Sequence, residues 1–378
     1  MDGRERIKRA LAHEVADHVA ITDTCWRSTI ARWRREGLPP DVAPEDYFGY
    51  DMAKVGFDQS PRFPVKILDD DGVHVIQTTP YGRVVRNVRD FSSVPETLDF
   101  PCKKREDWEK KVKPRLVADP DRIDWDREPP GGSLGDRRER DAVSDVARRG
   151  FGSAAYRKAR EKGNAVAFFA AIGNGHIHQT YLDVETLLMA VAMDPEWLID
   201  MYETVADLVV SMYDIMVDHG FEFDAAFLSC DLGFNYGTFF SPRHFEQQLH
   251  PVFSRVFSFF HDRGIPVILH SDGRIASLIP YFIEEGVDCL NPLEAKAGMD
   301  LVELKKQYGD KLSFMGGIDV RAMADPDPAV IEQEIRTKVP VAMEGGGFIY
   351  HSDHSVPDSV SFDQYRRVID LVLEYGTY

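Results

Sequence analysis

The sequence predicts an α/β fold, a (β/α)8 TIM barrel, on two observations. Short apolar runs alternate along the chain with longer helical patterns, which indicates a parallel sheet. There are eight such runs, the number of strands that close a barrel. A doubly wound open sheet is the alternative that the same alternation allows. The predicted strands span residues 19–23, 54–58, 166–172, 225–231, 266–272, 289–294, 312–319 and 347–351.

Each predicted strand is apolar along most of its length, as expected for a strand buried on both faces. Helical patterns lie between the later strands, at residues 185–219, 242–263, 275–285 and 300–308. Pro195 interrupts the first of these and divides it into two predicted helices. We therefore expect a single barrel domain over residues 1–378.

Two insertions interrupt this rhythm. Residues 60–90, after the second strand, contain β-ribbon patterns at 65–67, 72–78 and 83–88, with turn residues between them. We expect this ribbon to lie over or beside the barrel mouth as a flap. Residues 103–160, before the third strand, are rich in charge, Pro and Gly and predict a helix, a loop around 129–132 and another helix.

The composition limits the classes of partner that the protein can bind. Lys and Arg total 45 against 63 Asp and Glu, which gives a formal net charge of -18. Such a field repels phosphate backbones and anionic lipid headgroups and argues against nucleic-acid or membrane partners. We expect a small-molecule substrate, and a homodimer is left open.

The cysteines and the start of the chain indicate a cytoplasmic protein. The four cysteines are far apart and form no Cys-x-x-Cys pair, which argues against a thiolate-only zinc site. Residues 1–12 are charged and helical in pattern, unlike a signal peptide. No apolar run approaches the roughly 20 residues of a membrane span.

Polar residues that end different strands of a barrel converge on one mouth. His270 and Asp272 end a strongly apolar run. Imidazole suits metal binding or proton transfer, and residues two apart in extended chain face the same way. The other interpretation of Asp272 is a cap on the helix predicted from Ile275.

The neighbouring strands end in further polar residues. Asp231 either caps a turn or holds a substrate group, whereas Cys230 before it is expected in the core. Glu294 would accept a proton, bind a metal or pair with Lys296. We expect Asp231, Glu294 and His270 to open onto the same mouth.

Three more segments follow strands and contribute candidate substrate-binding residues. Tyr350, His351 and His354 follow the last strand and form the segment richest in chemistry. A glycine-containing loop after the third strand places two histidines at the mouth, and an arginine near an aromatic residue after the first strand can hold a carboxylate. These residues are His176, His178 and Arg27.

Taken in order, these segments resemble the uroporphyrinogen decarboxylase superfamily, which includes heme-pathway decarboxylases and zinc-dependent methyltransferases. The resemblance covers nearly the whole chain and is strongest towards the end. The segments that carry it are Asp194-Pro195-Glu196, Cys230-Asp231-Leu232-Gly233, Ser241-Pro242, His270-Ser271-Asp272-Gly273, Glu285-Gly286-Val287-Asp288, Phe314-Met315-Gly316-Gly317-Ile318-Asp319 and Gly345-Gly346-Gly347-Phe348-Ile349.

The resemblance implies roles, and the departures from it are informative. In the decarboxylases, an arginine-rich segment after the first strand faces the substrate carboxylates; here it reads Asp-Thr-Cys-Trp-Arg-Ser, and Arg27 replaces one arginine at most. Their substrate aspartate matches Asp58, and their late histidine matches His354. The methyltransferases hold zinc with a His-x-Cys pattern and a later cysteine, and here those positions are His270, Asp272 and His354.

The resemblance therefore implies a divalent metal, zinc in the first place, held by His270, Asp272 and His354, with Glu294 as a further candidate ligand. Oxygen and nitrogen ligands in place of thiolates suit Lewis-acid activation of an oxygen substrate. The hypothesis is demethylation of a small methoxylated or methylated compound, with Asp231 and Arg27 positioning it.

The methyl acceptor would be a corrinoid on a partner protein, because the chain has no Asp-x-His-x-x-Gly segment for binding a corrinoid. One alternative is a metal-free decarboxylase or lyase acting on a small carboxylated substrate, with His354 and Asp58 as acid and base. The other is a barrel that binds a ligand without catalysis.

Overall fold

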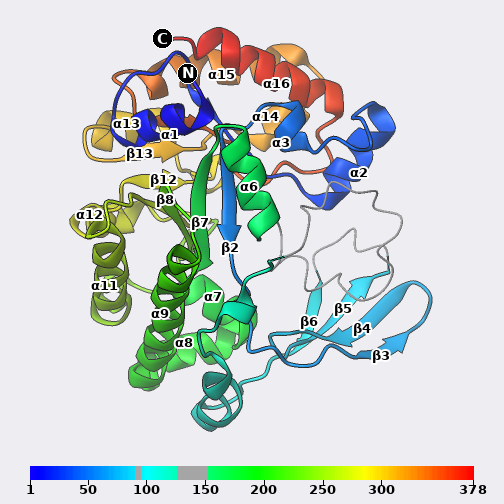
Figure 1. Ribbon diagram of the computed structural model, residues 1–378, viewed down its shortest axis with the longest axis vertical. Helices are drawn as coiled ribbons and strands as arrows, with labels where there is room; N and C mark the ends of the chain where they lie inside the picture. Colours follow the sequence, from blue (N-terminus) through cyan, green and yellow to red (C-terminus); the bar gives the residue numbers. More distant parts are fainter. Residues whose placement is uncertain (90–94, 126–151) are drawn as a thin grey trace.

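The computed structural model describes residues 1–89, 95–125 and 152–378, and its eight barrel strands form one parallel sheet (Figure 1). The order around the sheet is β1-β14-β13-β12-β11-β8-β7-β2. Each strand overlaps a predicted one, which confirms the (β/α)8 prediction. The strands are β1 Ala20–Ile21, β2 Met52–Gly56, β7 Ala165–Ala171, β8 Ala225–Ser229, β11 Val267–His270, β12 Cys289–Asn291, β13 Ser313–Met315 and β14 Phe348–Tyr350.

The first and last strands of this order lie side by side and nearly close the barrel. The Asp51 backbone N–H donates to the Ile21 carbonyl at 2.7 Å, and the Asp51 carboxylate accepts from the Ile21 N–H at 2.7 Å. The carboxylate replaces a missing rung of the sheet, so the open-sheet alternative is excluded.

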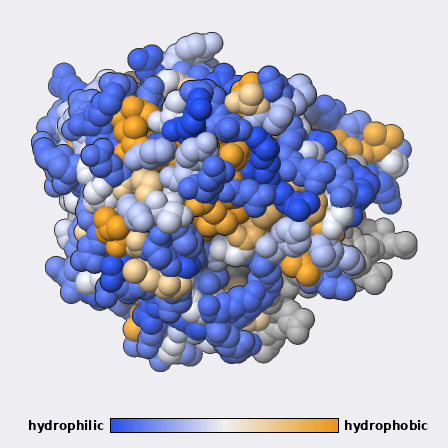
Figure 2. Space-filling view, turned by 90° about the horizontal axis from the view of Figure 1, so that it is seen from above, coloured by the Kyte–Doolittle hydropathy of each residue, from blue (hydrophilic) through white to orange (hydrophobic). Residues whose placement is uncertain are grey.

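Helix α1, Gly3–Leu11, plugs the amino-terminal end of the barrel. Its apolar residues Ile7, Ala10 and Leu11 are buried in one cluster with inward-facing strand residues such as Met52 and Ile349. Figure 2 views the molecule from the side on which both chain ends lie, and polar side chains cover most of that surface. The carboxyl ends of the strands lie at the opposite end of the barrel (Figure 1).

Helices surround the barrel and bury the larger core between themselves and the strands. The predicted break at Pro195 is confirmed, because α8 ends at Met193 and Pro195 begins α9. Within the described residues, no helix has both the length and the apolarity to cross a bilayer. The elements are α2 Arg27–Glu36, α3 Pro44–Tyr47, α7 Gly173–Thr180, α8 Val184–Met193, α9 Pro195–Asp218, α10 Pro242–His244, η4 Phe245–Leu249, α11 His250–His261, η5 Ala276–Leu278, α12 Ile279–Glu284, η6 Ala295–Ala297, α13 Leu301–Tyr308, α14 Val320–Ala324, α15 Pro328–Met343 and α16 Phe362–Tyr375.

The insertion after β2 is an antiparallel sheet that lies beside the end of the barrel where β2 ends (Figure 1). Its strands are β3 Ile67–Asp70, β4 His74–Thr78, β5 Val84–Val88 and β6 Glu96–Asp99. The predicted ribbon corresponds to the first three, and β6 is an additional strand. Tyr81, in the turn between β4 and β5, places its ring 5.9 Å from the ring of His176 in α7.

The insertion before β7 contains short helical segments and a longer helix. They are α4 Arg105–Asp107, η1 Trp108–Val112, η2 Lys113–Arg115, η3 Pro120–Arg122 and α6 Ser153–Glu161. The loop predicted around 129–132 lies outside the described residues. A short hairpin, β9 Gly233–Phe234 and β10 Gly237–Thr238, follows β8 at the mouth.

Candidate active site at the carboxyl end of the barrel

Strand alternation directs His270 into the barrel. Ile268 of β11 is buried in the inner cluster, so His270, two residues later, points inward at the mouth. Its ring lies 5.8 Å from the ring of Phe227 on β8, which is 1% exposed and lies beneath it. His270 thus stands on an apolar layer with its polar edge towards the mouth.

Asp231 and Asp272 follow β8 and β11 by two residues each, and glycines bring their loops together. A Cβ on Gly273, whose φ is +84°, would lie 2.3 Å from the Gly233 carbonyl carbon. The N–H of Asp272 donates to Asp231 Oδ1 at 3.3 Å. Asp231 itself has φ 29°, which residues other than glycine seldom adopt.

This close approach gives a first prediction. Gly273→Ala is expected to lower the free energy of unfolding by about 2 kcal/mol, because the new methyl overlaps backbone and the positive φ is unfavourable for alanine. Urea denaturation followed by circular dichroism measures it. Gly298→Ala is the control, because Gly298 has φ +83° but no atom within 4 Å of its Cβ position. Equal losses in the two variants would contradict the packing argument.

Asp272 stands between the two predicted histidines. Its Oδ1 lies 3.7 Å from His270 Nε2, and its Oδ2 lies 3.6 Å from His354 Nε2. Asp231 Oδ1 lies 3.5 Å from His270 Nε2. The four side chains are 17–30% exposed, so a small ligand can reach them. These separations are too long for strong hydrogen bonds and leave room for a shared cation.

The side chain of Asn291 fixes the tautomer of His270. Asn291 Nδ2 donates to the Met315 carbonyl at 2.9 Å, which turns its Oδ1 towards His270 Nδ1 at 2.6 Å. Nδ1 therefore carries the proton, and the lone pair of a neutral His270 lies on Nε2. That lone pair faces two carboxylates, an arrangement that a metal ion or a proton on Nε2 makes favourable.

Glu294 completes the cluster from the loop after β12. It is 5% exposed, and its Oε2 accepts the Gly273 N–H at 2.7 Å, while its Oε1 lies 2.9 Å from Lys296 Nζ. Asp272, Glu294 and His354 form one group whose ligand atoms lie within 4.8 Å of one another, and Asp231, His270 and Asp272 form a second. Asp272 belongs to both.

The donor set fits a divalent metal. Asp272 Oδ1 is buried without a hydrogen-bond partner in the described residues, although it points into the cluster. Burial opposes ionisation of Asp272, but the imidazoles of His270 and His354 hold its pKa at about 2. An ionised carboxylate flanked by imidazole nitrogens is a typical ligand set for zinc and similar ions.

Asp272 does not act as the helix cap considered from the sequence. The residue before η5 is Ile275, and no side chain caps that turn. The arrangement thus favours Asp272 as part of the mouth.

The residues after β14 point in alternate directions. His351 is 3% exposed and faces the barrel interior, on the side of Ile349. Tyr350 faces outward, where its hydroxyl donates to Asp23 Oδ2 at 3.4 Å beside Tyr365. The structure therefore does not bring Tyr350, a predicted substrate-binding residue, to the mouth.

The remaining predicted residues follow the ends of other barrel strands. Asp58 accepts hydrogen bonds from the backbone and side chain of Ser60 and from Arg62 Nε. His176 is buried, which lowers its pKa to about 4. His178 is bonded to the Asn174 carbonyl through Nδ1. Arg27 begins α2, just after the end of β1.

Several contacts at the mouth were not predicted. Lys54 of β2 extends over the Phe227 ring, Gln179 donates to Asp231 Oδ2 at 2.6 Å, and the Trp26 ring stacks 6.2 Å from that of His354. A lysine within an apolar strand was a usable signal for Lys54. The other contacts join distant loops and have no signature in the sequence.

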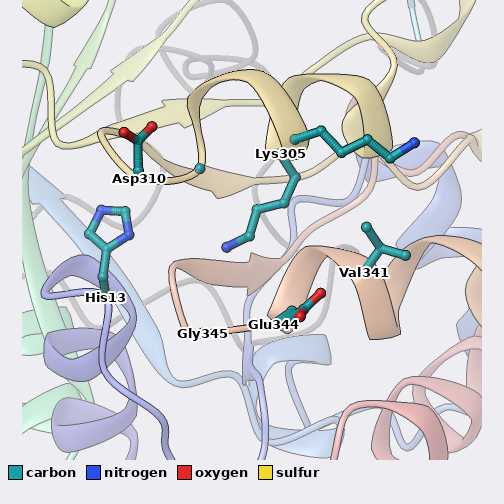
Figure 3. A pocket seen from close by; sticks show the side chains of 8 residues that line it. His13, Lys305, Asp310, Val341, Glu344 and Gly345 are labelled. Carbon is teal, nitrogen blue, oxygen red and sulfur yellow. The ribbon is translucent and has the colours of Figure 1, made fainter.

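A surface pocket of about 400 Å³ lies elsewhere, at the amino-terminal ends of β13 and β14 (Figure 3). Its lining includes His13, Lys305, Asp310 and Glu344. Lys305 Nζ donates to the Gly346 carbonyl at 2.6 Å and so serves the turn before β14. The strand-end cluster, and not this pocket, collects the chemistry expected of an active site.

A barrel with imidazoles and carboxylates at its strand ends defines a class of metal-capable barrel proteins. Within it, the chain belongs to the uroporphyrinogen decarboxylase (URO-D) family, whose profile matches residues 159–375. No relative was found among curated proteins.

A solved structure supports the fold. The chain is similar to a methyltransferase from Methanosarcina mazei, with a TM-score of 0.61 and 14% identity over 99% of both chains. A C-terminal domain of a putative chitinase from Desulfitobacterium hafniense is less similar, with a TM-score of 0.40 and 7% identity over 95% of this chain and 99% of that one. The first match supports the barrel fold over the whole chain.

Proposed function

We propose that this protein is a methyltransferase that demethylates a small methoxylated or methylated compound and passes the methyl group to a corrinoid on a partner protein. The observation that carries the proposal is the pair of imidazole nitrogens, His270 Nε2 and His354 Nε2, set against the two oxygens of Asp272. The family and the Methanosarcina mazei likeness support it.

His270, Asp272 and His354 would hold a divalent metal, with Asp231 or Glu294 as a further ligand. Bound there, the metal supplies Lewis-acid polarisation of the substrate oxygen. All four cysteines are buried outside this cluster, and burial raises the pKa of Cys230 well above its usual value. The cluster therefore offers oxygen and nitrogen donors, which suit an oxygen leaving group.

The chain's own residues position the reaction. Asn291 keeps the Nε2 lone pair of His270 facing the mouth, and Gln179 holds Asp231 beside it. The methyl carbon would leave the oxygen and bond to the cobalt(I) of the partner's corrinoid, which serves as co-substrate and would supply the electron pair of the new bond. The oxygen keeps the bonding electrons and takes a proton from solvent, which the partial exposure of the cluster admits.

The test uses free cob(I)alamin as the acceptor and a panel of methoxylated aromatic and methylated aliphatic compounds. The expected result is methylcobalamin formation, seen by absorbance and mass spectrometry, in protein that contains about one equivalent of metal. Carbon dioxide release from a carboxylated substrate by metal-free protein would instead establish the decarboxylase or lyase alternative. Ligand binding without any turnover would establish the non-catalytic one.

A further inference from the structure

Lys54 projects into the barrel just below the mouth. Met52, two residues earlier in β2, is buried in the inner cluster, so Lys54 points the same way and is half-buried. Its Nζ lies 3.9 Å from the centre of the Phe227 ring, and that ring lies 5.8 Å from the ring of His270. The ammonium group is therefore a neighbour of the metal-capable cluster.

The ammonium of Lys54 makes no direct ion pair with a described residue. Within the described parts of the chain, Nζ makes no hydrogen bond or ion pair, and it rests on an aromatic face. Such a contact offsets only part of the cost of removing the charge from water. Burial lowers the pKa of Lys54 to about 8, and Asp23 opposes that shift, so the group still carries its charge at neutral pH.

His351 presents a second unsatisfied group to the same space. Its Nδ1 donates to the Ser352 carbonyl at 2.6 Å, which leaves Nε2 as an acceptor. Nε2 is buried and has no hydrogen-bond partner among the described residues. Burial, and then the charge of Lys54, lower the pKa of His351 to about 3, so the imidazole is neutral. The two residues come from neighbouring parts of the barrel, because β14, which leads to His351, pairs with β1, and β1 lies beside the start of β2, which carries Lys54. Nδ1 of His351 also lies 3.5 Å from Asp23 Oδ1, on the side away from Nε2.

We propose that Lys54 and His351 form a subsite for a small organic acid, in which Lys54 binds the carboxylate and His351 accepts a hydrogen bond from an adjacent hydroxyl. A cation without a direct ion pair and a buried acceptor without a donor are both satisfied by one such ligand. The inference rests on the proposed function in one respect: the methylated end of the acid would face the cluster around Asp272. The substrate class is then a methylated organic acid.

Calorimetric titration in the presence of chelator tests the subsite without turnover. The probes are salicylate, its neutral amide and benzoate, with glycolate, glycolamide and acetate as a smaller set. The full-length protein should bind the hydroxy acids at least about ten-fold more tightly than the amides. Lys54→Met should remove that difference and Lys54→Arg should restore part of it, because the arginine keeps the charge.

His351→Gln should reduce the preference for salicylate over benzoate and leave benzoate binding unchanged. Lys103→Met is the matched control, since Lys103 also lies over an aromatic ring, that of Phe100, but its side chain is exposed and pairs with Asp99. Circular dichroism establishes that each variant folds.

Wild-type affinity for the acids in Lys54→Met, or no binding of any acid to the wild-type protein, would overturn the subsite. Because the titration is made without metal, failure of methyl transfer leaves its outcome unaffected. Failure of the subsite likewise leaves the metal assay to be judged separately.

Discussion

Asp272→Asn is expected to leave the protein with less than about one-tenth of an equivalent of metal and to lower methyl transfer of the order of 10³-fold. The reason is geometric, because Asp272 is the group that both imidazoles reach, through Oδ1 at 3.7 Å and Oδ2 at 3.6 Å. An amide offers one neutral oxygen in place of a bridging anion. Elemental analysis of protein purified without chelator measures the first effect, and the cob(I)alamin assay measures the second.

Asp71→Asn is the control for this change. Asp71 Oδ2 lies 3.4 Å from His74 Nδ1 in an exposed turn of the β3–β6 sheet, so it is also an aspartate beside a histidine. Metal content and activity should stay as in the wild type there. Full metal occupancy in Asp272→Asn would remove Asp272 from the ligand set, and full activity in the metal-free protein would remove the metal from the reaction.

The strands of the barrel could be predicted because each is buried on both faces and reads as an apolar run between helical patterns. The same rule located His270, Asp231 and Glu294, since polar residues at the ends of parallel strands meet at one mouth. The same rule also predicted that the segment after β14 lies near the candidate active site.

What could not be predicted is which side of a strand faces inward. Tyr350 and His351 are neighbours in sequence, and a shift of one residue in register would exchange their positions. In the structure Ile349 faces the interior, so His351 shares that side and Tyr350 contacts Asp23 outside the barrel. Lys54 was missed for a related reason. The predicted strand began at Lys54, which made it a strand-end residue, whereas β2 begins at Met52 and Lys54 lies in its interior.

Contacts between distant loops could also not be predicted from the sequence. The side chain of Asn291 on β12 orients His270 on the neighbouring strand β11, and Gln179 of α7 donates a hydrogen bond to Asp231 after β8. Neither residue type nor spacing marks such pairs. They depend on the path of each loop, which is decided by packing of the entire barrel.

The loop after β2 depends on Arg122. Replacing Arg122 is expected to have a large effect on the free energy of unfolding. Arg122 is 2% exposed and donates to the carbonyls of Val117, Asp58, Ser60 and Arg115 at 2.6–2.9 Å. In this way one guanidinium joins the end of β2 to the insertion before β7. Methionine would fill a similar volume but donate to none of these carbonyls.

Arg122→Met is therefore expected to lower the free energy of unfolding by about 3–5 kcal/mol, since several buried acceptors lose their donor at once. Urea denaturation followed by tryptophan fluorescence measures the loss. Arg105→Met is the control, because Arg105 is 41% exposed and pairs with Glu109 and Asp194 at the surface, where such pairs contribute at most about 1 kcal/mol. A loss in Arg122→Met no greater than in Arg105→Met would mean that water replaces the guanidinium and that the loop after β2 does not depend on it.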